Sequence, residues 1–302
     1  MSTLWGEAAA AEMAEAARRD AAQPPIDWSA HPPGCESDLV DVPSGRLARI
    51  AMGPVDGPRV VLVPGMTGSK EDFVLMMPLF AAVGYRVEAF DMAGQYESHG
   101  AGPENLDPPG SRYTLELFVD DLLAVLQTRP GPVHALGYSF AGTVAAVAAL
   151  HRPELFSSLT LLSAPPLAGQ ALRGFKVLGP LSPLVPGRAL GRPFIAALKH
   201  NVHRAPHDRA VFVTARFGLT RTSSVGDILA LMKRTPDVAE GLRNTGIPVL
   251  VATGTGDVWQ VDAHRAFAER IGARFVALRT GHSPCETAPH QLTLEMLRLA
   301  GR

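Results

Sequence analysis

A short run of small residues around Ser139 has the composition of a turn that exposes a nucleophile. Residues 137–142 read Gly-Tyr-Ser-Phe-Ala-Gly and follow an apolar run at 132–136. Glycine and alanine leave room for a sharp turn between a strand and a helix, which would lift the Ser139 hydroxyl clear of the backbone. The first free amides of that helix would stabilise a negative charge forming in the same space. The alternative is that Ser139 only caps a helix at about 141–150.

A second glycine-containing turn is the candidate for the rest of an oxyanion site. Residues 64–68 read Pro-Gly-Met-Thr-Gly and follow the apolar run 60–63. We predict that the backbone N–H groups of Met66 and Phe140 form the donor pair that acyl transfer requires. Thr67, through its hydroxyl, and Tyr138 are the candidate substrate contacts. The alternative is an ordinary glycine-rich turn.

Two polar residues in later turns are the candidates for the acid and the base. Asp257 closes the turn Thr-Gly-Thr-Gly-Asp, where its carboxylate could orient a histidine, although an Asx-turn is the ordinary explanation. His282 follows Gly281 in a loop, and a neutral imidazole there could take the Ser139 proton, although the chain has 10 histidines. Asp262 is the rival acid, but it is better suited to be the N-cap of the helix that follows.

Ser139, Asp257 and His282 each come directly after a predicted strand. In a parallel sheet the carboxyl ends of the strands gather at one edge, and ligands bind outside that edge. The three side chains are therefore expected to meet there. A Ser–His–Asp triad of this kind performs nucleophilic acyl transfer.

Short apolar runs alternate with amphipathic segments along most of the chain, a pattern that predicts a mostly parallel sheet with helices on both faces. An antiparallel hairpin at 39–42 and 46–52 comes first. Further strands are expected at 60–63, 85–90, 133–136, 159–162, 248–252 and 274–278, and helices at 3–22, 71–83, 115–127, 141–150, 262–271 and 289–299.

The alternation divides the chain of 302 residues into three regions. Residues 1–37 form an N-terminal helix and a proline-rich lead-in. Residues 38–164 together with 246–302 form the α/β core. Residues 165–245 break the rhythm, and we interpret them as a helical lid inserted over the carboxyl ends of the strands.

Composition narrows the range of partners. The net charge of -1 gives no reason to expect nucleic acid or an acidic membrane. No stretch approaches the roughly 18 apolar residues of a membrane span. Cys35 and Cys285 lie far apart, without the spacing of a disulfide framework or a metal site, so a reducing cytoplasm is the expected location. No cofactor and no metal are predicted.

These motifs resemble those of the α/β-hydrolase superfamily, over residues 38–300. In layout the chain is similar to the lid-bearing esterases, lactonases and cofactor-free haloperoxidases. The chain order Ser139, Asp257, His282 is that of this superfamily and differs from the orders of chymotrypsin and subtilisin. Ser139 also argues against the dehalogenases and epoxide hydrolases of this fold, which use an aspartate nucleophile.

Two loops depart from the usual pattern of the superfamily. The oxyanion loop usually begins His-Gly, whereas here it begins Pro64-Gly65. The loop at 91–98 reads Asp-Met-Ala-Gly-Gln-Tyr-Glu-Ser, with Gln-Tyr in place of a small pair. We expect the second departure to reshape the wall of the cleft.

The predicted lid is strongly basic. Residues 165–245 hold 12 of the 28 Lys and Arg and 4 of the 29 Asp and Glu, so this region is about +8 and the remainder about -9. A basic lid could attract an anionic substrate. The alternative, which we prefer, is a lid surface that complements an acidic face of the core.

The sequence therefore predicts a serine hydrolase that cleaves a carboxylic ester, lactone or thioester through an acyl-enzyme. An acyltransferase or cyclase, a lyase or a carbon–carbon bond hydrolase could use the same triad, and a non-catalytic ligand-binding protein is a more remote alternative. The expected partner is a small-molecule substrate. A homodimer, in which the N-terminal helix contacts a second copy, is an open alternative.

Overall fold

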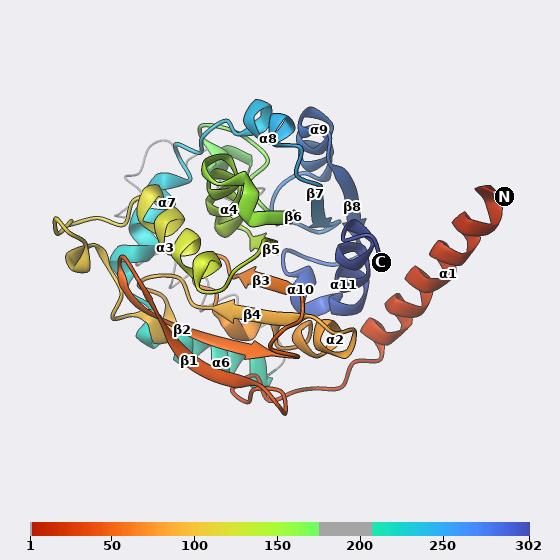
Figure 1. Cartoon of the computed structure of the whole chain (residues 1–302), viewed down its shortest axis with the longest axis horizontal. Coiled ribbons are helices and arrows are strands. Elements are labelled where there is room, and N and C mark those ends of the chain that lie inside the picture. The colour runs from red at the N-terminus through yellow and green to blue at the C-terminus, as the bar shows by residue number, and fades with distance from the viewer. Residues whose placement is uncertain (1, 175–206) are drawn as a thin grey trace.

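The computed structural model describes residues 2–174 and 207–302, and its centre is an eight-stranded sheet (Figure 1). The strand order is β1-β2-β4-β3-β5-β6-β7-β8. The pairs β1–β2 and β2–β4 are antiparallel, and all other neighbouring pairs are parallel. The strands are β1 Glu36–Val42, β2 Gly45–Met52, β3 Arg59–Val63, β4 Arg86–Phe90, β5 Val133–Tyr138, β6 Phe156–Leu162, β7 Val249–Gly254 and β8 Arg274–Leu278.

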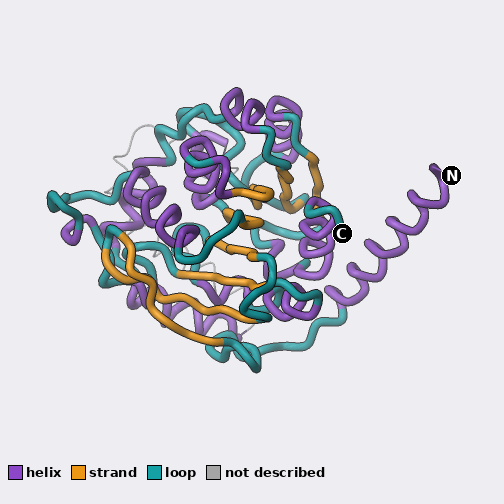
Figure 2. The backbone as a smooth tube through the Cα atoms, in the orientation of Figure 1, coloured by secondary structure: helices purple, strands orange, loops and turns teal. Residues whose placement is uncertain are grey.

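Both faces of the sheet are buried, which explains why its central strands are apolar at nearly every position. In β3, Val61 and Val63 pack into one core layer with residues of α3, α4 and α9. The alternate residues Val60 and Leu62 pack into the opposite layer with residues of α2 and α11. Figure 2 shows the strands enclosed between these two sets of helices.

The helices follow the predicted order with small differences at their ends. Their bounds are α1 Ser2–Ala21, α2 Met77–Ala82, α3 Leu115–Gln127, α4 Phe140–His151, α6 His207–Leu219, α7 Thr222–Leu231, α8 Ala239–Thr245, α9 Val261–Ile271, α10 Pro284–Thr287 and α11 Pro289–Leu299. Short 3-10 helices are η1 Lys70–Phe73, η2 Tyr96–Ser98, η3 Pro103–Asn105, η4 Pro153–Leu155 and η5 Ala171–Gly174.

Two local predictions were wrong. The helix expected at 71–83 is split into η1 and α2, because Pro78 cannot donate a hydrogen bond or lie inside a helix and is placed in the first turn of α2. Asp262 is not the N-cap of α9. Gln260 occupies that position, and Asp262 lies in the first turn.

The predicted N-terminal helix is present as α1, which extends away from the body of the molecule (Figure 1). Hydrogen bonds at Ala9 and Asp20 attach it to α11. Asp20 accepts hydrogen bonds from the backbone amides of His290 and Gln291, at 2.8 and 3.1 Å, and Arg298 donates to the carbonyl of Ala9 at 2.7 Å. A groove of about 480 Å³ separates the two helices.

Between β6 and β7 the chain leaves the sheet, in the region predicted to be a lid. Its described elements are η5, α6, α7 and α8, while residues 175–206 lie outside the described part. The lid and the domain boundaries therefore remain predictions. No described helix is long and apolar enough to cross a membrane.

The turn between β1 and β2 is fastened to α3 by a buried carboxyl group. Asp121 accepts hydrogen bonds from the backbone amide of Ser44 at 3.0 Å and from its hydroxyl at 2.6 Å. Burial raises the pKa of Asp121 to about 6, although both hydrogen bonds from Ser44 act to lower it. Asp121 thus holds a proton more tightly in the folded protein than in the unfolded chain.

Because the pKa of Asp121 is higher in the folded protein than in the unfolded chain, the free energy of unfolding depends on pH. We expect the free energy of unfolding to fall as pH rises from about 4 to about 6, by at most about 3 kcal/mol from this group. Asp121→Asn retains an acceptor for Ser44 but no titration, so it should flatten this part of the profile. Urea unfolding of both proteins between pH 4 and pH 7 measures the slopes. Identical slopes would contradict the assignment to Asp121.

Candidate active site

Ser139 lies at the sharp turn predicted between β5 and α4. Its backbone has φ 53° and ψ −124°, a conformation that L-residues rarely adopt, and its side chain makes no capping hydrogen bond. The turn requires glycine at position 137, because an added Cβ there would lie 2.4 Å from the carbonyl oxygen of Ala141. The hydroxyl is therefore presented by a strained turn and is not used to cap the helix.

Asp257 lies just after β7 and is completely buried. The Thr253 hydroxyl donates to its Oδ2 at 2.8 Å, and the Trp259 amide donates to its Oδ1 at 3.1 Å. Burial acts to raise the pKa of Asp257, but hydrogen bonds and the positive potential of His282 outweigh it, so the pKa is lowered. The carboxylate is ionised at neutral pH.

His282, just after β8, bridges the other two residues. Its Nδ1 lies 3.1 Å from Asp257 Oδ1, and its Nε2 lies 3.2 Å from Ser139 Oγ. An ionised carboxylate accepts only, so it selects the tautomer with the proton on Nδ1 and leaves Nε2 free to accept from the serine. The structure thus brings together the three residues predicted from strand ends. Among the described residues it is Asp257, and not the rival Asp262, that pairs with His282.

The loop at 64–68 lies against this serine. An added Cβ on Gly65 would lie 2.9 Å from the Cβ of Ser139, so only glycine lets the loop approach so closely. Thr67 has φ 63°, and its amide donates to Gln95 Oε1 at 2.9 Å. In the described residues the amide of Met66 has no acceptor, and the Phe140 amide at the start of α4 has no intrahelical acceptor. Both amides are therefore available to donate to an oxyanion as predicted, and the donor pair stays a prediction.

Gln95 gives a physical role to the unusual loop at 91–98. Its Oε1 accepts from the Thr67 amide, and its Nε2 donates to the hydroxyl of Ser224 at 2.6 Å. Ser224 is on α7. The side chain is completely buried. The sequence flagged this position as a departure from the superfamily, but its two partners could not be foreseen without the fold.

Tyr138 was predicted as a substrate contact. Its hydroxyl lies 2.7 Å from that of Ser283, and its ring is 5.3 Å from the ring of His282. The hydroxyl thus joins the residue before the serine to the residue after the histidine. Tyr138 and Thr67 both line the adjoining cavity, so a substrate contact remains a prediction for each.

A cavity of about 330 Å³ adjoins Ser139 and His282. Part of its wall is apolar, from Met66, Val213, Phe217, Met232 and Val258. The remainder carries four charged side chains, two from η1 and α10 and two from α6, which the sequence analysis did not identify as site residues. They are Asp72, Glu286, Arg209 and Arg216.

These four residues form a buried ion network. Arg209 Nη2 donates to Asp72 Oδ1 at 2.9 Å and to Glu286 Oε1 at 2.5 Å. Arg216 Nη1 donates to the same oxygen of Asp72 at 2.6 Å and to the Ser69 hydroxyl at 3.2 Å. The network joins α6 to the segments that follow the oxyanion loop and His282, so it fixes one wall of the cavity.

A second histidine was also missed. His264, on α9, is buried, and its Nε2 lies 4.0 Å from Asp257 Oδ2. Burial lowers its pKa to about 4 despite the nearby carboxylate, so its ring is neutral at neutral pH. It adds no positive charge to compete with His282 for Asp257.

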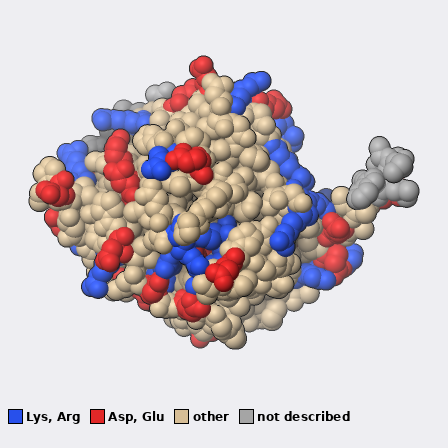
Figure 3. Space-filling view, in the orientation of Figure 1, with Lys and Arg blue, Asp and Glu red and all other residues tan. Residues whose placement is uncertain are grey.

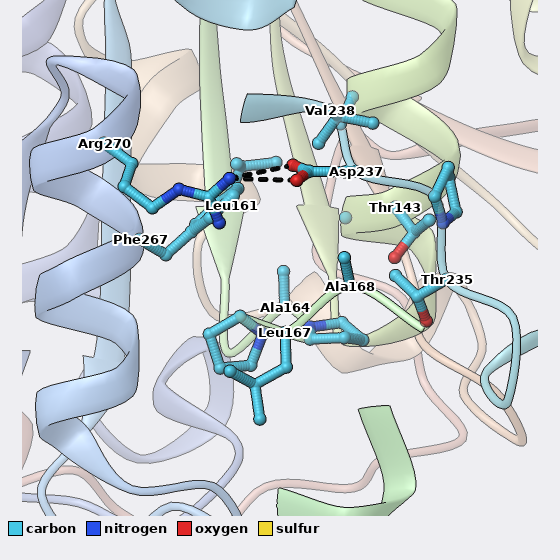
Figure 4. A pocket seen from close by; sticks show the side chains of 15 residues that line it. Thr143, Leu161, Ala164, Leu167, Ala168, Thr235, Asp237, Val238, Phe267 and Arg270 are labelled. Carbon is cyan, nitrogen blue, oxygen red and sulfur yellow. Dashed lines mark hydrogen bonds and ion pairs between the residues drawn. The ribbon is translucent and has the colours of Figure 1, made fainter. Parts of the chain in front are cut away.

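Another hollow shares no lining residue with the cavity at Ser139 (Figure 4). Its volume is about 20 Å³, enough for a single water molecule. Arg270 and Asp237, paired at 2.9 Å, lie on one side of it. No cluster of potential metal ligands occurs within the described residues. The cavity beside Ser139 is therefore the candidate substrate site.

Comparison with known proteins agrees with this fold. A family model described as the alpha/beta hydrolase fold matches residues 58–184. The thioesterase domain from the curacin biosynthetic pathway superposes with a TM-score of 0.66 at 18% identity, covering 87% of this chain and 99% of that domain. The chain has the α/β-hydrolase fold.

Curated relatives match shorter parts of the chain. "Probable oxidoreductase EphD" of Mycobacterium tuberculosis is 37% identical over 135 residues, which is 43% of this chain and 22% of that protein. A probable esterase of Oryza sativa is 40% identical over 110 residues, which is 35% of this chain and 38% of that protein. The chain thus matches well under half the length of either relative. These relatives indicate that the chain is an enzyme, and they do not identify its reaction.

Cys285 lies three residues after His282 but is completely buried, and burial raises the pKa of its thiol well above the ordinary value. Since the thiolate is the reactive form, we expect Cys285 to resist iodoacetamide in the folded protein at pH 8 and to react after unfolding in urea. Mass spectrometry of the alkylated peptides measures this, with the partly exposed Cys35 as an internal comparison. Rapid native alkylation of Cys285 would contradict its burial.

Proposed function

We propose that this protein is a serine hydrolase that cleaves a carboxylic ester, lactone or thioester through an acyl-enzyme. The observation that carries the proposal is the pair of contacts made by His282, to Ser139 Oγ at 3.2 Å and to Asp257 Oδ1 at 3.1 Å. A strained serine, a histidine that bridges it to the acid, and a buried carboxylate are the parts that acyl transfer needs.

Each residue has a defined part in the proposed reaction. Ser139 Oγ attacks the substrate carbonyl carbon while His282 Nε2 takes the hydroxyl proton. Asp257 stabilises the imidazolium that forms, and the amides of Met66 and Phe140 bind the oxyanion. His282 then gives its proton to the leaving alcohol or thiol. Water repeats the sequence on the acyl-enzyme and releases the acid.

The alternatives share these first steps. An acyltransferase or cyclase would admit another nucleophile in place of water, and a lyase or a carbon–carbon bond hydrolase would break a different bond. Hydrolysis is favoured because similar proteins include one named an esterase and a thioesterase domain of the same fold. A non-catalytic role is disfavoured, because a binding protein gains nothing from a strained serine beside a histidine.

Three arginines from the described part of the region 165–245 are paired with acidic residues of the core. In its described part, Arg209 and Arg216 pair with Asp72, and Arg221 pairs with Glu104. On the face shown in Figure 3, basic and acidic side chains are interspersed. These pairs favour a lid that complements an acidic core over long-range attraction of anions.

The nucleophile can be tested directly. A fluorophosphonate probe should modify the wild-type protein at Ser139, because the probe captures a serine activated by a general base. Ser139→Ala should remain unmodified. Intact-protein mass spectrometry and peptide mapping locate the adduct. A folded wild-type protein that the probe leaves unmodified would refute the proposal.

The acid has a matched control in Asp262, five residues further along the chain. Asp257→Asn should lower kcat for a 4-nitrophenyl ester by about three to four orders of magnitude, because it favours the wrong tautomer of His282. Asp262→Asn, in the exposed first turn of α9, should stay within about twofold of wild type. Circular dichroism of both variants controls for folding. The reverse result would show that the acid is misassigned.

A further inference from the structure

Arg216 lies in the wall of the proposed substrate cavity, and one edge of its guanidinium has no hydrogen-bond acceptor among the described residues. Its side chain is 7% exposed, and its hydrogen bonds to described residues all leave from Nη1. Its Nε is buried and has no acceptor among the described residues. A buried donor of this kind is costly unless an acceptor reaches it.

The vacant edge has the shape of a carboxylate-binding fork. A guanidinium can present Nε and Nη2 side by side, and each N–H then meets one oxygen of a carboxylate. Arg49 binds Asp38 in this way, with distances of 2.9 and 2.5 Å. Arg59 binds Glu88 in the same way, at 3.1 and 3.2 Å. Arg216 has the same edge, but no described side chain occupies it.

Arg209 is the less suitable of the two arginines. Its Nη2 is held between Asp72 and Glu286, and its guanidinium lies 4.2 Å from the centre of the Trp28 ring. It therefore holds the network together. Arg209 also has a buried Nη1 without an acceptor among the described residues, but it is tied to both acids, whereas Arg216 contacts one acid through Nη1 and its Nε has no acceptor among the described residues.

Ser139 and Arg216 also line one and the same cavity, whose volume is sufficient for an acyl chain. Ser139, His282 and Arg216 line the same volume of about 330 Å³. Val213, Phe217 and Met232 line it too, and these side chains suit methylene groups. A chain bound with its carbonyl at Ser139 would extend along apolar side chains toward a cationic group.

We propose that the substrate is the monoester, thioester or lactone of an acid whose acyl chain ends in a carboxylate, and that the Nε and Nη2 edge of Arg216 binds this carboxylate. The inference rests on the proposed hydrolase function and names its substrate class. It concerns recognition at one fork, which is distinct from long-range attraction by a basic lid.

The charge balance of the network accommodates such an anion. Asp72 and Glu286 already offset the two guanidiniums, so a substrate carboxylate would be a third negative group. Burial raises the pKa of Glu286, although Arg209 acts to lower it. Glu286 is therefore more readily protonated than an ordinary glutamate. Asp72 accepts hydrogen bonds from both arginines and from the Ser69 amide.

The test compares ester pairs of equal chain length. The mono-4-nitrophenyl esters of adipic and pimelic acid are matched with 4-nitrophenyl hexanoate and heptanoate. A third set of esters carries a terminal amide in place of the terminal carboxylate. In the wild type we expect kcat/KM for the better acid ester to exceed that of its neutral partner by about 10-fold or more. Arg216→Met should bring the ratio to about 1 or below.

Arg221→Met is the matched control, because it removes a charge from the same region at a residue paired with Glu104 outside the cavity lining. It should keep the wild-type ratio. A wild-type ratio of 1 or less, a preference for the amide over the carboxylate, or a ratio unchanged in a folded Arg216→Met would each overturn the proposal. Should Arg216→Met fail to fold, the wild-type ratios and the amide arm still decide.

Failure of this inference is separable from failure of the hydrolase. Turnover of the neutral esters with fluorophosphonate labelling of Ser139, but without preference for the acid esters, would overturn only the carboxylate site. Absence of labelling and of turnover for every ester would overturn the hydrolase and this inference together.

Discussion

The bond between a buried aspartate and one nitrogen of a histidine is the interaction on which the candidate site depends. Asp257 has no solvent exposure, and hydrogen bonds from Thr253 and Trp259 hold it in place, while His282 is the main cause that lowers its pKa against the effect of burial. That carboxylate fixes which nitrogen of His282 carries a proton. The parallel pairing of β5, β6, β7 and β8 then places the three residues near one another, because it brings the ends of their strands to one edge of the sheet.

A second constraint concerns the cavity wall. Arg209 and Arg216 are buried against Asp72 and Glu286, and removing four charges from water costs free energy that their mutual contacts must offset. Such a network contributes little net stability but strongly penalises any arrangement that separates its members. It therefore serves to fix where α6 lies relative to the segments around Ser69 and Glu286.

Much of this could be predicted from sequence, because local patterns decide it. Alternating apolar runs gave the sheet, and the turns ending in Ser139, Asp257 and His282 gave the three central residues. The split at Pro78 is a local effect of proline that the apolar pattern at 71–83 obscured. The N-cap of α9 was missed because neighbouring residues offer similar local starts for a helix. Asp72 and Arg216 are 144 positions apart, and no local pattern records such a contact.

The side chain of Gln95 connects two parts of the chain that are far apart in the sequence. Its carbonyl oxygen is used by Thr67 and its amino group by Ser224, so one side chain couples the oxyanion loop to α7. A change at position 224 would leave a buried amide group unsatisfied and so be felt at the oxyanion loop. Positions 95 and 224 should therefore covary among homologues, because a substitution in α7 at position 224 also affects the loops at 64–68 and 91–98.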